Sequence, residues 1–398
     1  MKRYLPRLLA GPLREARASF PAVLVTGPRQ SGKTTLLREE MGEETAYTTF
    51  DDPLEREYAR SDPEGFLDRF EGRPAILDEV QYVPEIFQYL KIRIDRERDA
   101  RGRWLLTGSQ HFGLMASVTE SLAGRVAVLE LLPVSTPELP AEHRDDAGRA
   151  IWLGGYPEPR LHPEARDLWM SSYIRTYVER DVRQLHNVQD LRAFETFVVL
   201  AASRHGQELN MASLSRETGI SQPTVKSWLG ALEAAYLVHL LPPYFESFGK
   251  RLVRSPKLYF LDPGLACTLT RQPSAEAALA GAMGGALFEG LVVSEVVKTF
   301  TNAGRRPELY FWRSRDGLEV DLLVPTGDGL IPIEIKSTAT PTSRHARVLD
   351  RFRRTVGDAA TPYGFLACRV KESRPLPGGH IALPWQELPG RLADRLGF

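Results

Sequence analysis

The chain has 398 residues, and its 51 lysine and arginine residues balance 51 aspartate and glutamate residues, so its formal net charge is zero. At ~100–200 residues per domain this length predicts roughly two to three domains, and the 42% of hydrophobic residues argues against long disordered regions. The sequence has no run near the ~18 apolar residues of a membrane helix, and its N-terminal segment lacks an apolar secretory core. With only two cysteines, Cys267 and Cys368, we expect a cytoplasmic protein without disulfides, a cysteine-bound zinc ion or a membrane partner.

The first third of the chain alternates short apolar runs with helical patterns, which is typical of a parallel α/β sheet. We predict strands over residues 22–26, 47–50, 74–77, 104–107 and 126–131. Prolines and a polar run at 133–150 indicate a break between domains.

Beyond this break, apolar residues spaced by three or four predict helices from about 166 to 241, followed by a strand over 257–261. The Ala- and Gly-rich segment 275–286 predicts a linker or a loosely packed connection. A C-terminal α/β domain is expected from a helix over 287–300 and strands over 309–313, 318–324 and 331–337.

A phosphate-binding loop follows the first predicted strand. The sequence GPRQSGKT matches G-x-x-x-x-G-K-[ST] without a mismatch and opens a predicted helix. In such a loop backbone N–H groups surround phosphate oxygens, Lys33 neutralises the β- and γ-phosphates, and the Thr34 hydroxyl binds Mg²⁺. The residues predicted to bind the nucleotide here are Gly27, Pro28, Arg29, Gln30, Ser31, Gly32, Lys33, Thr34 and Thr35.

Acidic and small polar residues end two further predicted strands. The apolar run at 74–77 is followed by Asp78, predicted to hold Mg²⁺, and by Glu79, predicted to polarise the attacking water. The strand at 104–107 leads into Ser109, and either Ser109 or Thr107 is a candidate for orienting that water. The alternative for each is an ordinary polar strand end.

Residues 211–229 have the pattern of a helix-turn-helix, with Gly219 ending the first helix and Ser221 capping the second. Residues 236–241 and 257–260 are predicted to form the two strands of a wing. Between them, 250–257 holds four cations, including Lys257, which we expect to contact phosphates at the wing tip. Because the second helix carries one cation, three roles stay open: sequence-specific DNA reading, non-specific DNA contact and a structural role.

The C-terminal third contains two carboxylates and a lysine in a pattern suited to a metal site. Glu334 and Lys336 alternate with isoleucines and are expected on one strand face, and Asp321 ends the preceding predicted strand. Carboxylates hold a divalent metal, and a lysine stabilises charge developing on a phosphate. Glu289 is a further candidate metal ligand and Glu295 a weaker one. The arginines of 344–354 form either a path for DNA phosphates or a solvated helical face.

The order of GPRQSGKTT, FDDP, LDEVQ, LTGSQ and SLAGR over roughly 20–135 resembles the bacterial and archaeal AAA+ ATPases. The resemblance implies that Arg125, the arginine of SLAGR, is an arginine finger that acts on a neighbouring subunit's nucleotide, and hence a homo-oligomer; an ion-paired surface arginine is the alternative. It further implies that GGYP at 154–157 senses adenine, and it leaves Asp51 and Asp52 as secondary contacts or helix caps.

The elements ALFEGLVVSE, EVDLLV and PIEIKST resemble the PD-(D/E)xK nuclease fold that commonly follows this type of ATPase. The predicted architecture is α/β and multidomain: an AAA+ core over 1–140, a helical lid or connector over 141–195, a winged helix over 196–270 and a nuclease-like, restriction-endonuclease-like domain over 271–398. The resemblance implies ATP and Mg²⁺ as cofactors, with Mn²⁺ as an alternative ion at the C-terminal site, and Asp321, Glu334 and Lys336 as catalytic residues.

Two functions from different classes therefore remain. The first is an ATP-dependent enzyme that processes DNA with its C-terminal metal site, which the intact D…E-x-K pattern favours. The second is an ATP-gated regulatory scaffold in which an inert nuclease fold docks DNA or a protein partner. Zero net charge and the weakly basic second helix of the helix-turn-helix favour the scaffold.

Overall fold

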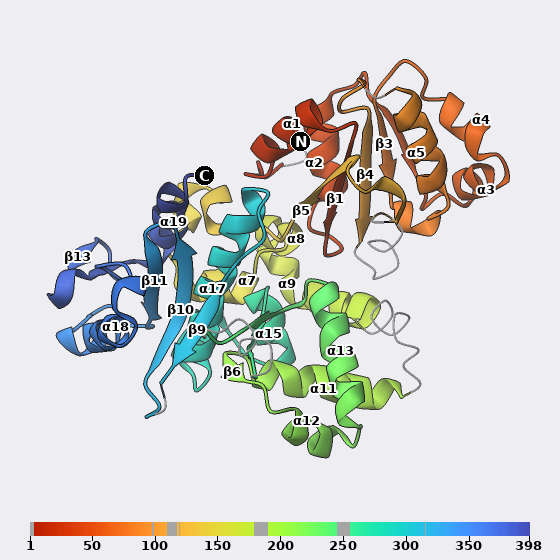
Figure 1. Ribbon diagram of the computed structural model, residues 1–398. Coiled ribbons are helices and arrows are strands. Elements are labelled where there is room, and N and C mark those ends of the chain that lie inside the picture. The colour runs from red at the N-terminus through yellow and green to blue at the C-terminus, as the bar shows by residue number, and fades with distance from the viewer. Residues whose placement is uncertain are drawn as a thin grey trace. The chain divides into compact units, whose positions relative to one another are not determined.

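The computed structural model describes residues 4–97, 99–109, 118, 120–178, 190–244, 255–314 and 316–398, except for the side chains of 177 and 178. The chain divides into two compact units (Figure 1). The first unit is Met1–Val134 with Ala234–Tyr236 and Phe300–Arg305, and the second is Ser135–Glu233, Leu237–Thr299 and Arg306–Phe398.

The first unit is built on a five-stranded parallel sheet in the order β2-β3-β4-β1-β5. Its strands are β1 (Ala22–Gly27), β2 (Ala46–Thr49), β3 (Ala75–Asp78), β4 (Trp104–Ser109) and β5 (Val126–Glu130). The predicted parallel sheet is therefore confirmed, with strand ends shifted by one or two residues. Because neighbouring strands are parallel, the residues after β1, β3 and β4 meet at one edge of the sheet.

Helices cover both faces of this sheet: α1 (Ala10–Ser19), α2 (Lys33–Met41), α3 (Pro53–Ser61), α4 (Pro63–Asp68) and α5 (Ile86–Arg96), with a 3₁₀ turn at Val80–Tyr82. The alternation of side chains along β1 explains the two layers, since Leu24 packs in one apolar cluster with Phe66 while Val23 and Val25 pack in another with Leu36. Asp52 caps α3 by accepting a hydrogen bond from the Leu54 N–H at 2.8 Å, so it is a structural cap.

The second unit begins with helices and a small antiparallel sheet. The helices are α7 (Ala147–Leu153), α8 (Pro157–Leu161), α9 (Arg166–Tyr173) with a π-helical extension Ile174–Val178, α11 (Leu191–Ser203), α12 (Met211–Thr218), α13 (Gln222–Ala234), α15 (Pro263–Leu269) and α16 (Ala275–Ala280). The strands are β6 (Gln207–Glu208), β7 (Val238–Leu241) and β8 (Lys257–Phe260), in the order β6-β8-β7. The predicted helix-turn-helix is present as α12 and α13, and Gly219 ends α12 in the left-handed conformation.

The expectation of a linker over 275–286 is wrong. Ser274 caps α16 by accepting a hydrogen bond from the Ala277 N–H at 3.2 Å, and Ala278 is fully buried. The next helix begins at Gly284, so the connection is short. Alanine is a strong helix former, and a capped alanine run packs closely because its side chains are small.

The C-terminal part of the second unit contains a mixed six-stranded sheet in the order β13-β14-β12-β11-β10-β9. Its elements are α17 (Gly284–Asn302), β9 (Tyr310–Arg313), β10 (Glu319–Thr326), β11 (Gly329–Ile335), α18 (Ser343–Val356), β12 (Phe365–Cys368), β13 (Arg374–Pro375), β14 (Ile381–Pro384) and α19 (Leu388–Leu396). Strands β9, β10 and β11 are antiparallel, whereas β11 and β12 are parallel. Asp321 lies inside β10 and not at its end, which corrects its predicted position.

Short 3₁₀ turns connect many of these elements, at Thr136–Glu138, Ala141–His143, Pro163–Ala165, Gly357–Ala359, Pro377–Gly379 and Trp385–Glu387. Among the helices of the described ranges, none combines the length and the apolar character needed to cross a bilayer.

Candidate functional sites

The phosphate-binding loop connects β1 to α2 through two glycines that no other residue can replace without strain. Gly27 has φ +143°, and a Cβ atom there would lie 2.3 Å from the Leu131 carbonyl oxygen. Gly32 has φ +95° and precedes the first turn of α2, where Lys33 and Thr34 begin the helix. The loop therefore brings the N-terminus of α2 to the edge of the sheet where β1, β3 and β4 end.

Lys33 is buried and folds back onto its own loop. Its Nζ atom donates hydrogen bonds to the carbonyl oxygens of Gly27 at 3.1 Å and Pro28 at 2.9 Å. Burial lowers the pKa of Lys33 to about 8, against the opposing effects of Glu79 and Asp78. The two carbonyl groups that accept hydrogen bonds from Lys33 are neutral, so they leave the charge of the ammonium available for a phosphate oxygen.

Asp78 is the centre of a hydroxyl network that joins α2 to three strands. Its Oδ1 atom accepts hydrogen bonds from the hydroxyls of Thr34 at 2.7 Å and of Thr107, and its Oδ2 atom accepts one from Tyr47 at 3.0 Å. Burial and the Asp78 carboxylate raise the pKa of Tyr47 to about 12, so the phenol remains a donor. The network brings together the two predicted Mg²⁺ ligands, Thr34 and Asp78, and adds Tyr47, which the sequence did not single out.

Glu79 is held in the left-handed conformation, with φ +58°, which is strained for a residue with a Cβ atom. Its N–H donates to the Thr107 hydroxyl at 3.1 Å, and its side chain accepts a hydrogen bond from Gln81. Thr107 therefore orients both acidic residues, while the Ser109 hydroxyl is buried without a hydrogen-bond partner among the described residues.

Arg7 braces the loop from outside the predicted motif. Its guanidinium donates to the carbonyl oxygens of Ser31 at 2.8 Å and Leu132 at 2.6 Å. Two other loop residues lie nearer the surface, since Arg29 donates to the Tyr82 hydroxyl and Gln30 is exposed with φ +63°. A buried arginine outside any recognisable motif gave no signal in the sequence.

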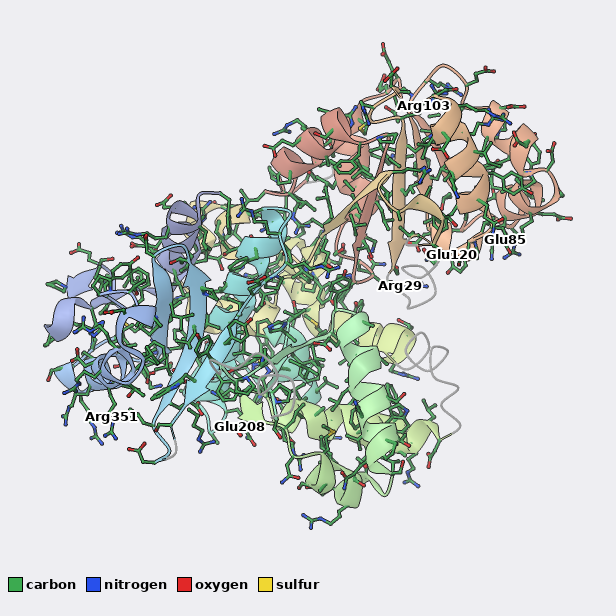
Figure 2. The ribbon with its side chains drawn as sticks, viewed as in Figure 1. Arg29, Glu85, Arg103, Glu120, Glu208 and Arg351 are labelled. Carbon is green, nitrogen blue, oxygen red and sulfur yellow. The ribbon has the colours of Figure 1, made fainter. Side chains whose placement is uncertain are left out.

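Arg125 lies at the edge of the sheet opposite to the phosphate-binding loop. Strands β1 and β5 are parallel, and their first residues, Ala22 and Val126, lie opposite each other. Arg125 directly precedes β5, so it lies where β1 begins, whereas the phosphate-binding loop lies where β1 ends. Figure 2 shows these two edges of the first unit through its labelled residues Arg103, just before β4, and Arg29, just after β1. Arg125 forms a two-pronged ion pair with Asp95, at 2.8 and 2.9 Å.

The C-terminal carboxylates lie on adjacent strands of the second unit. Lys336 Nζ is 2.6 Å from Glu334 Oε1 and 3.0 Å from Asp321 Oδ2, so the structure brings together all three residues predicted to be catalytic. Asp321 Oδ2 also accepts the Ile335 N–H at 2.8 Å. Glu334 Oε2 is buried without a hydrogen-bond partner within the described ranges.

A second lysine enters this cluster from β8. Lys257 Nζ lies 3.0 Å from Glu289 Oε1 and also contacts Glu319, and the Tyr259 hydroxyl donates to the same Glu289 oxygen. The expectation that Lys257 contacts phosphates at a wing tip is therefore wrong, because its side chain is 4% exposed and ion-paired. Its partner is 32 residues away along the chain, which explains why the sequence pattern did not reveal it. The remaining cations of that run lie outside the described residues.

The cluster contains four carboxyl groups and two lysines. Burial and the Asp321 charge raise the pKa of Glu334 to about 8 and that of Glu289 to about 7. Burial alone would lower the pKa of both lysines, but nearby carboxylates outweigh it and raise the pKa of both above the ordinary value. In the part of the chain that the structure describes, no three acidic, histidine or cysteine side chains are arranged as a metal-binding group. The acids are turned toward ammonium groups instead.

Two other features singled out in the sequence have structural partners in the second unit. Glu295, the weaker candidate metal ligand, accepts the Thr136 N–H at 2.6 Å and pairs with Lys298 at 3.0 Å, so it ties α17 to the turn Thr136–Glu138. In GGYP, the Gly155 N–H donates to Asp262 at 2.6 Å, and the Tyr156 hydroxyl lies 2.9 Å from that of Tyr173.

The arginine-rich face of α18 serves partly to hold its own domain. Arg351, labelled in Figure 2, pairs with Asp316 at 2.5 Å, and Arg353 donates to the carbonyl oxygens of Pro362 and Gly378.

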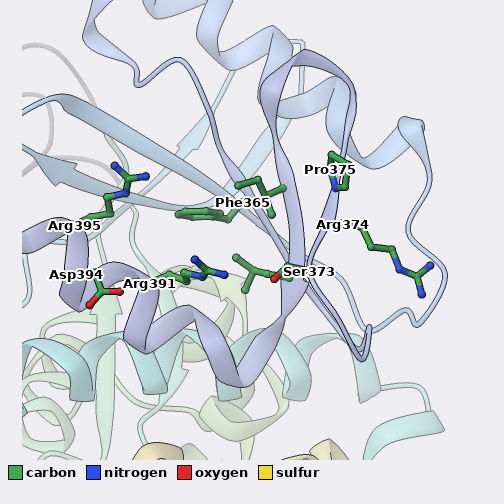
Figure 3. Close-up of a pocket in the computed structure, with 9 residues that line it drawn as sticks. Phe365, Ser373, Arg374, Pro375, Arg391, Asp394 and Arg395 are labelled. Carbon is green, nitrogen blue, oxygen red and sulfur yellow. The ribbon is translucent and has the colours of Figure 1, made fainter.

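A surface pocket of about 570 Å³ is lined by residues of β12, β13, β14 and α19 (Figure 3). Phe365 and Leu383 contribute apolar surface, and Arg374, Arg391 and Arg395 contribute charge.

Comparison with known families divides the chain into three regions. Residues 19–139 match the family described as an AAA domain, so the first unit has the fold of an AAA-type ATPase, as the sequence resemblance implied. Residues 144–276 and 284–388 match two families described as domains of unknown function, DUF8612 and DUF4143.

Among individual relatives, two uncharacterized mycobacterial proteins cover most of the chain. Mb2031c of Mycobacterium bovis and Rv2008c of Mycobacterium tuberculosis are each 34% identical over 337 residues, 84% of this chain and 74% of either relative. Among solved structures, the Walker-type ATPase PABY2304 of Pyrococcus abyssi is 16% identical, with a TM-score of 0.41 over 66% of this chain and 94% of that chain.

Proposed function

The chain belongs to the family of the two mycobacterial proteins, and on this premise we propose that it hydrolyses ATP and acts on DNA through its C-terminal domain. The observation that carries the ATPase part is the buried carboxylate of Asp78 beside the Thr34 hydroxyl at the start of α2. The family match to an AAA domain supports the same reading.

The residues of the loop fit a nucleotide with Mg²⁺. Thr34 and Asp78 offer hard oxygen ligands and would hold the ion, while Lys33, held by two backbone carbonyls that phosphate oxygens can replace, would neutralise the β- and γ-phosphates. Bound Mg²⁺ withdraws charge from the terminal phosphate oxygens. Glu79 would accept a proton from water, and the hydrogen bond from its N–H to the Thr107 hydroxyl supports this proposal by fixing its backbone.

We infer a homo-oligomer from the position of Arg125. An arginine at the far edge of the sheet is too distant from its own loop, whereas a neighbouring subunit can meet that edge. The pair with Asp95 is partly exposed, so it can open at low cost. Arg125 would then stabilise charge on the neighbour's γ-phosphate.

The proposal for the C-terminal domain is metal-dependent cleavage of phosphodiester bonds. The observation that favours it is the Glu334 Oε2 atom, which is buried without a hydrogen-bond partner in the described part of the chain, while Lys336 pairs with both Glu334 and Asp321. Glu289, Asp321 and Glu334 would hold Mg²⁺ or Mn²⁺, which activates water when bound, and Lys336 would stabilise charge on the cleaved phosphate. The order α17-β9-β10-β11-α18-β12 agrees with the proposed nuclease-like fold.

The second candidate is an ATP-gated scaffold whose nuclease-like domain is inert. The ion pairs of Lys257 and Lys336 favour it, because ammonium groups already occupy the carboxylates that a metal would need. In this case α12 and α13, as a winged helix, would dock DNA or a protein partner. The exposed residues Gln222, Lys226 and Ser227 of α13 offer hydrogen-bonding groups and one positive charge.

The ATPase proposal is tested by Lys33→Ala in the purified full chain. Removing the charge that faces the phosphates should lower hydrolysis by at least about 100-fold. Lys91→Ala, which removes an exposed lysine of α5 from the same unit, should leave the rate unchanged. Equal rates in all three proteins would refute an ATPase at this loop.

The nuclease proposal is tested with branched, single-stranded and duplex DNA, Mg²⁺ or Mn²⁺, and with or without ATP. Cleavage by the wild type that disappears in Glu334→Ala would support the metal site, and its dependence on ATP would show coupling between the domains. An active ATPase that cleaves none of these substrates would favour the scaffold.

A further inference from the structure

Lys257 occupies the acidic cluster from a strand outside the C-terminal sheet. It begins β8, in the small β6-β8-β7 sheet, whereas its carboxylate partners come from α17 and β10. The side chain is 4% exposed, so its ammonium is almost fully removed from water. A buried ammonium needs partners that compensate for its lost hydration, and Glu289 and Glu319 supply that compensation for Lys257.

The same carboxylate is a candidate metal ligand. Glu289 Oε1 accepts hydrogen bonds from both Lys257 Nζ and the Tyr259 hydroxyl, so its lone pairs are engaged. A divalent cation needs those oxygen lone pairs directly, and two cations within bonding distance of one oxygen repel each other strongly in a buried site.

We propose that Lys257 is a built-in counter-ion that competes with a divalent cation for Glu289, so that the metal site of the C-terminal domain forms only when Lys257 withdraws. This inference rests on the metal-dependent form of the proposed function. It accounts for the engagement of Glu289, while Lys336 pairs with Asp321 and Glu334 and the acids form no metal-binding group among the described residues. The four-carbon stem of lysine allows the ammonium to leave while β8 keeps its pairing.

Lys257 is thereby a residue that sets the metal affinity of the domain. Lys336 differs from it, because Lys336 follows β11 directly, is 41% exposed and pairs with Asp321 and Glu334. The exposed lysine can turn toward solvent or substrate, whereas the buried one must be displaced. Withdrawal of Lys257 would couple metal binding to the small β6-β8-β7 sheet, whose strands lie on both sides of the helix-turn-helix in the sequence.

The first test uses the wild-type full chain and Mn²⁺ without nucleotide. Acetylation of lysines by an amine-reactive ester is followed by peptide mass spectrometry, with and without the metal. We expect Mn²⁺ to raise the labelling rate of Lys257 by about tenfold or more, since labelling requires the ammonium to leave its buried position. Lys298 is the internal control, because it is equally buried and paired but contacts Glu295 outside the cluster.

The second test measures Mn²⁺ binding by electron paramagnetic resonance, with Asp78→Asn in every protein to remove the first-unit site. Lys257→Met should bind Mn²⁺ about tenfold more tightly than the parent, because the competing charge is gone. Lys257→Arg, which keeps the charge, should bind like the parent, and adding Glu334→Gln to Lys257→Met should abolish the gain. The labelling test needs no variant and so remains decisive if Lys257→Met fails to fold.

The outcomes separate this inference from the functions on which it rests. Mn²⁺ binding that is equal in the parent and in Lys257→Met, with constant labelling of Lys257, overturns the competition and keeps the metal site. The absence of Mn²⁺ binding in every protein overturns both. Neither result changes the ATPase proposal, which Lys33→Ala tests.

Discussion

The two units gather carboxylates in chemically different ways. In the first, the hydroxyls of Thr34, Thr107 and Tyr47 donate to Asp78, which orients the carboxylate and leaves its charge intact. In the second, Lys257 and Lys336 hold the carboxylates and cancel part of their charge. Neutral donors prepare a carboxylate for a cation, whereas ammonium groups occupy the place of one.

Acidic residues that look alike in a sequence can therefore have different readiness for a metal ion. Both clusters include acids predicted from motifs, yet hydroxyl groups surround Asp78 in the first, whereas lysines pair with the acids of the second. We expect changes in the first unit to act directly on hydrolysis, and charged groups buried in the second to be tolerated only when paired.

The largest effect is expected from Glu79→Gln. The amide cannot accept the proton of the attacking water, so hydrolysis should fall by roughly 10³-fold while ATP binding persists, because Lys33 and Thr34 remain. Single-turnover hydrolysis and equilibrium binding of labelled ATP measure the two quantities. Glu85→Gln is the matched control, because Glu85 is an acid that also follows β3 (Figure 2). If Glu79→Gln kept the wild-type rate of hydrolysis, the acids of the first unit would not act directly in hydrolysis, and the proposed difference between the acids of the two units would be refuted.

Arg125→Ala should lower hydrolysis by about 100-fold without weakening ATP binding, because one charge opposite the γ-phosphate of a neighbour is lost. Wild-type specific activity should rise with protein concentration. Asp95→Asn breaks the ion pair but keeps the arginine, and it should remain active. An equal loss in Asp95→Asn, or activity independent of dilution, would instead make the pair structural.

The strands and the phosphate-binding loop of the first unit could be predicted because their signals are local. Buried strands appear as apolar runs, and the loop needs glycines at fixed spacing where no Cβ atom fits, as at Gly27. Helix α1 gave no clear pattern, since Pro12 and several charged residues interrupt its apolar positions, although proline is tolerated in a first turn.

The acidic cluster shows where such prediction ends. Asp321, Glu334 and Lys336 were found because they are close in sequence and alternate along strands. The roles of Lys257 and Arg7 depend on partners that folding brings from distant segments, and a lysine in an apolar strand looks the same whether it is paired or exposed. Charge compensation is a tertiary property, so the sequence predicted the acids and not their neutralisation.

The stability of the fold at acidic pH tests whether a buried charge in the second unit is tolerated only when it is paired. The His205 ring is fully buried, its Nδ1 atom accepts the Phe260 N–H at 3.0 Å, and burial lowers the pKa of His205 to about 4. The unfolded chain therefore binds more protons than the folded one between about pH 6.5 and 4, and stability is lost as the pH falls through this window.

At pH 5 this one histidine should cost about 2 kcal/mol relative to its contribution at neutral pH. Urea unfolding of His205→Gln should show a smaller loss from pH 7 to 5, while the exposed control His143→Gln should follow the wild type. Some slope remains in the variant because burial also lowers the pKa of His239 to about 4. An unchanged slope in His205→Gln would mean that the folded protein accommodates a charged imidazole without a paired acid.

The smallest effect is expected from Tyr47→Phe, which tests directly whether neutral hydroxyl donors prepare Asp78 for a cation. The variant removes one neutral donor from Asp78 Oδ2 and leaves the charge of the site unchanged. Loss of about 1 kcal/mol of orienting interaction should raise the Mg²⁺ concentration for half-maximal hydrolysis by about fivefold, and excess Mg²⁺ should restore the maximal rate. Tyr58→Phe, a hydroxyl deletion elsewhere in the unit, is the control. If Asp78 instead required compensation of its charge, Tyr47→Phe would leave the Mg²⁺ dependence unchanged. Hydroxyl donors would then not explain the difference between this site and the acidic cluster of the second unit.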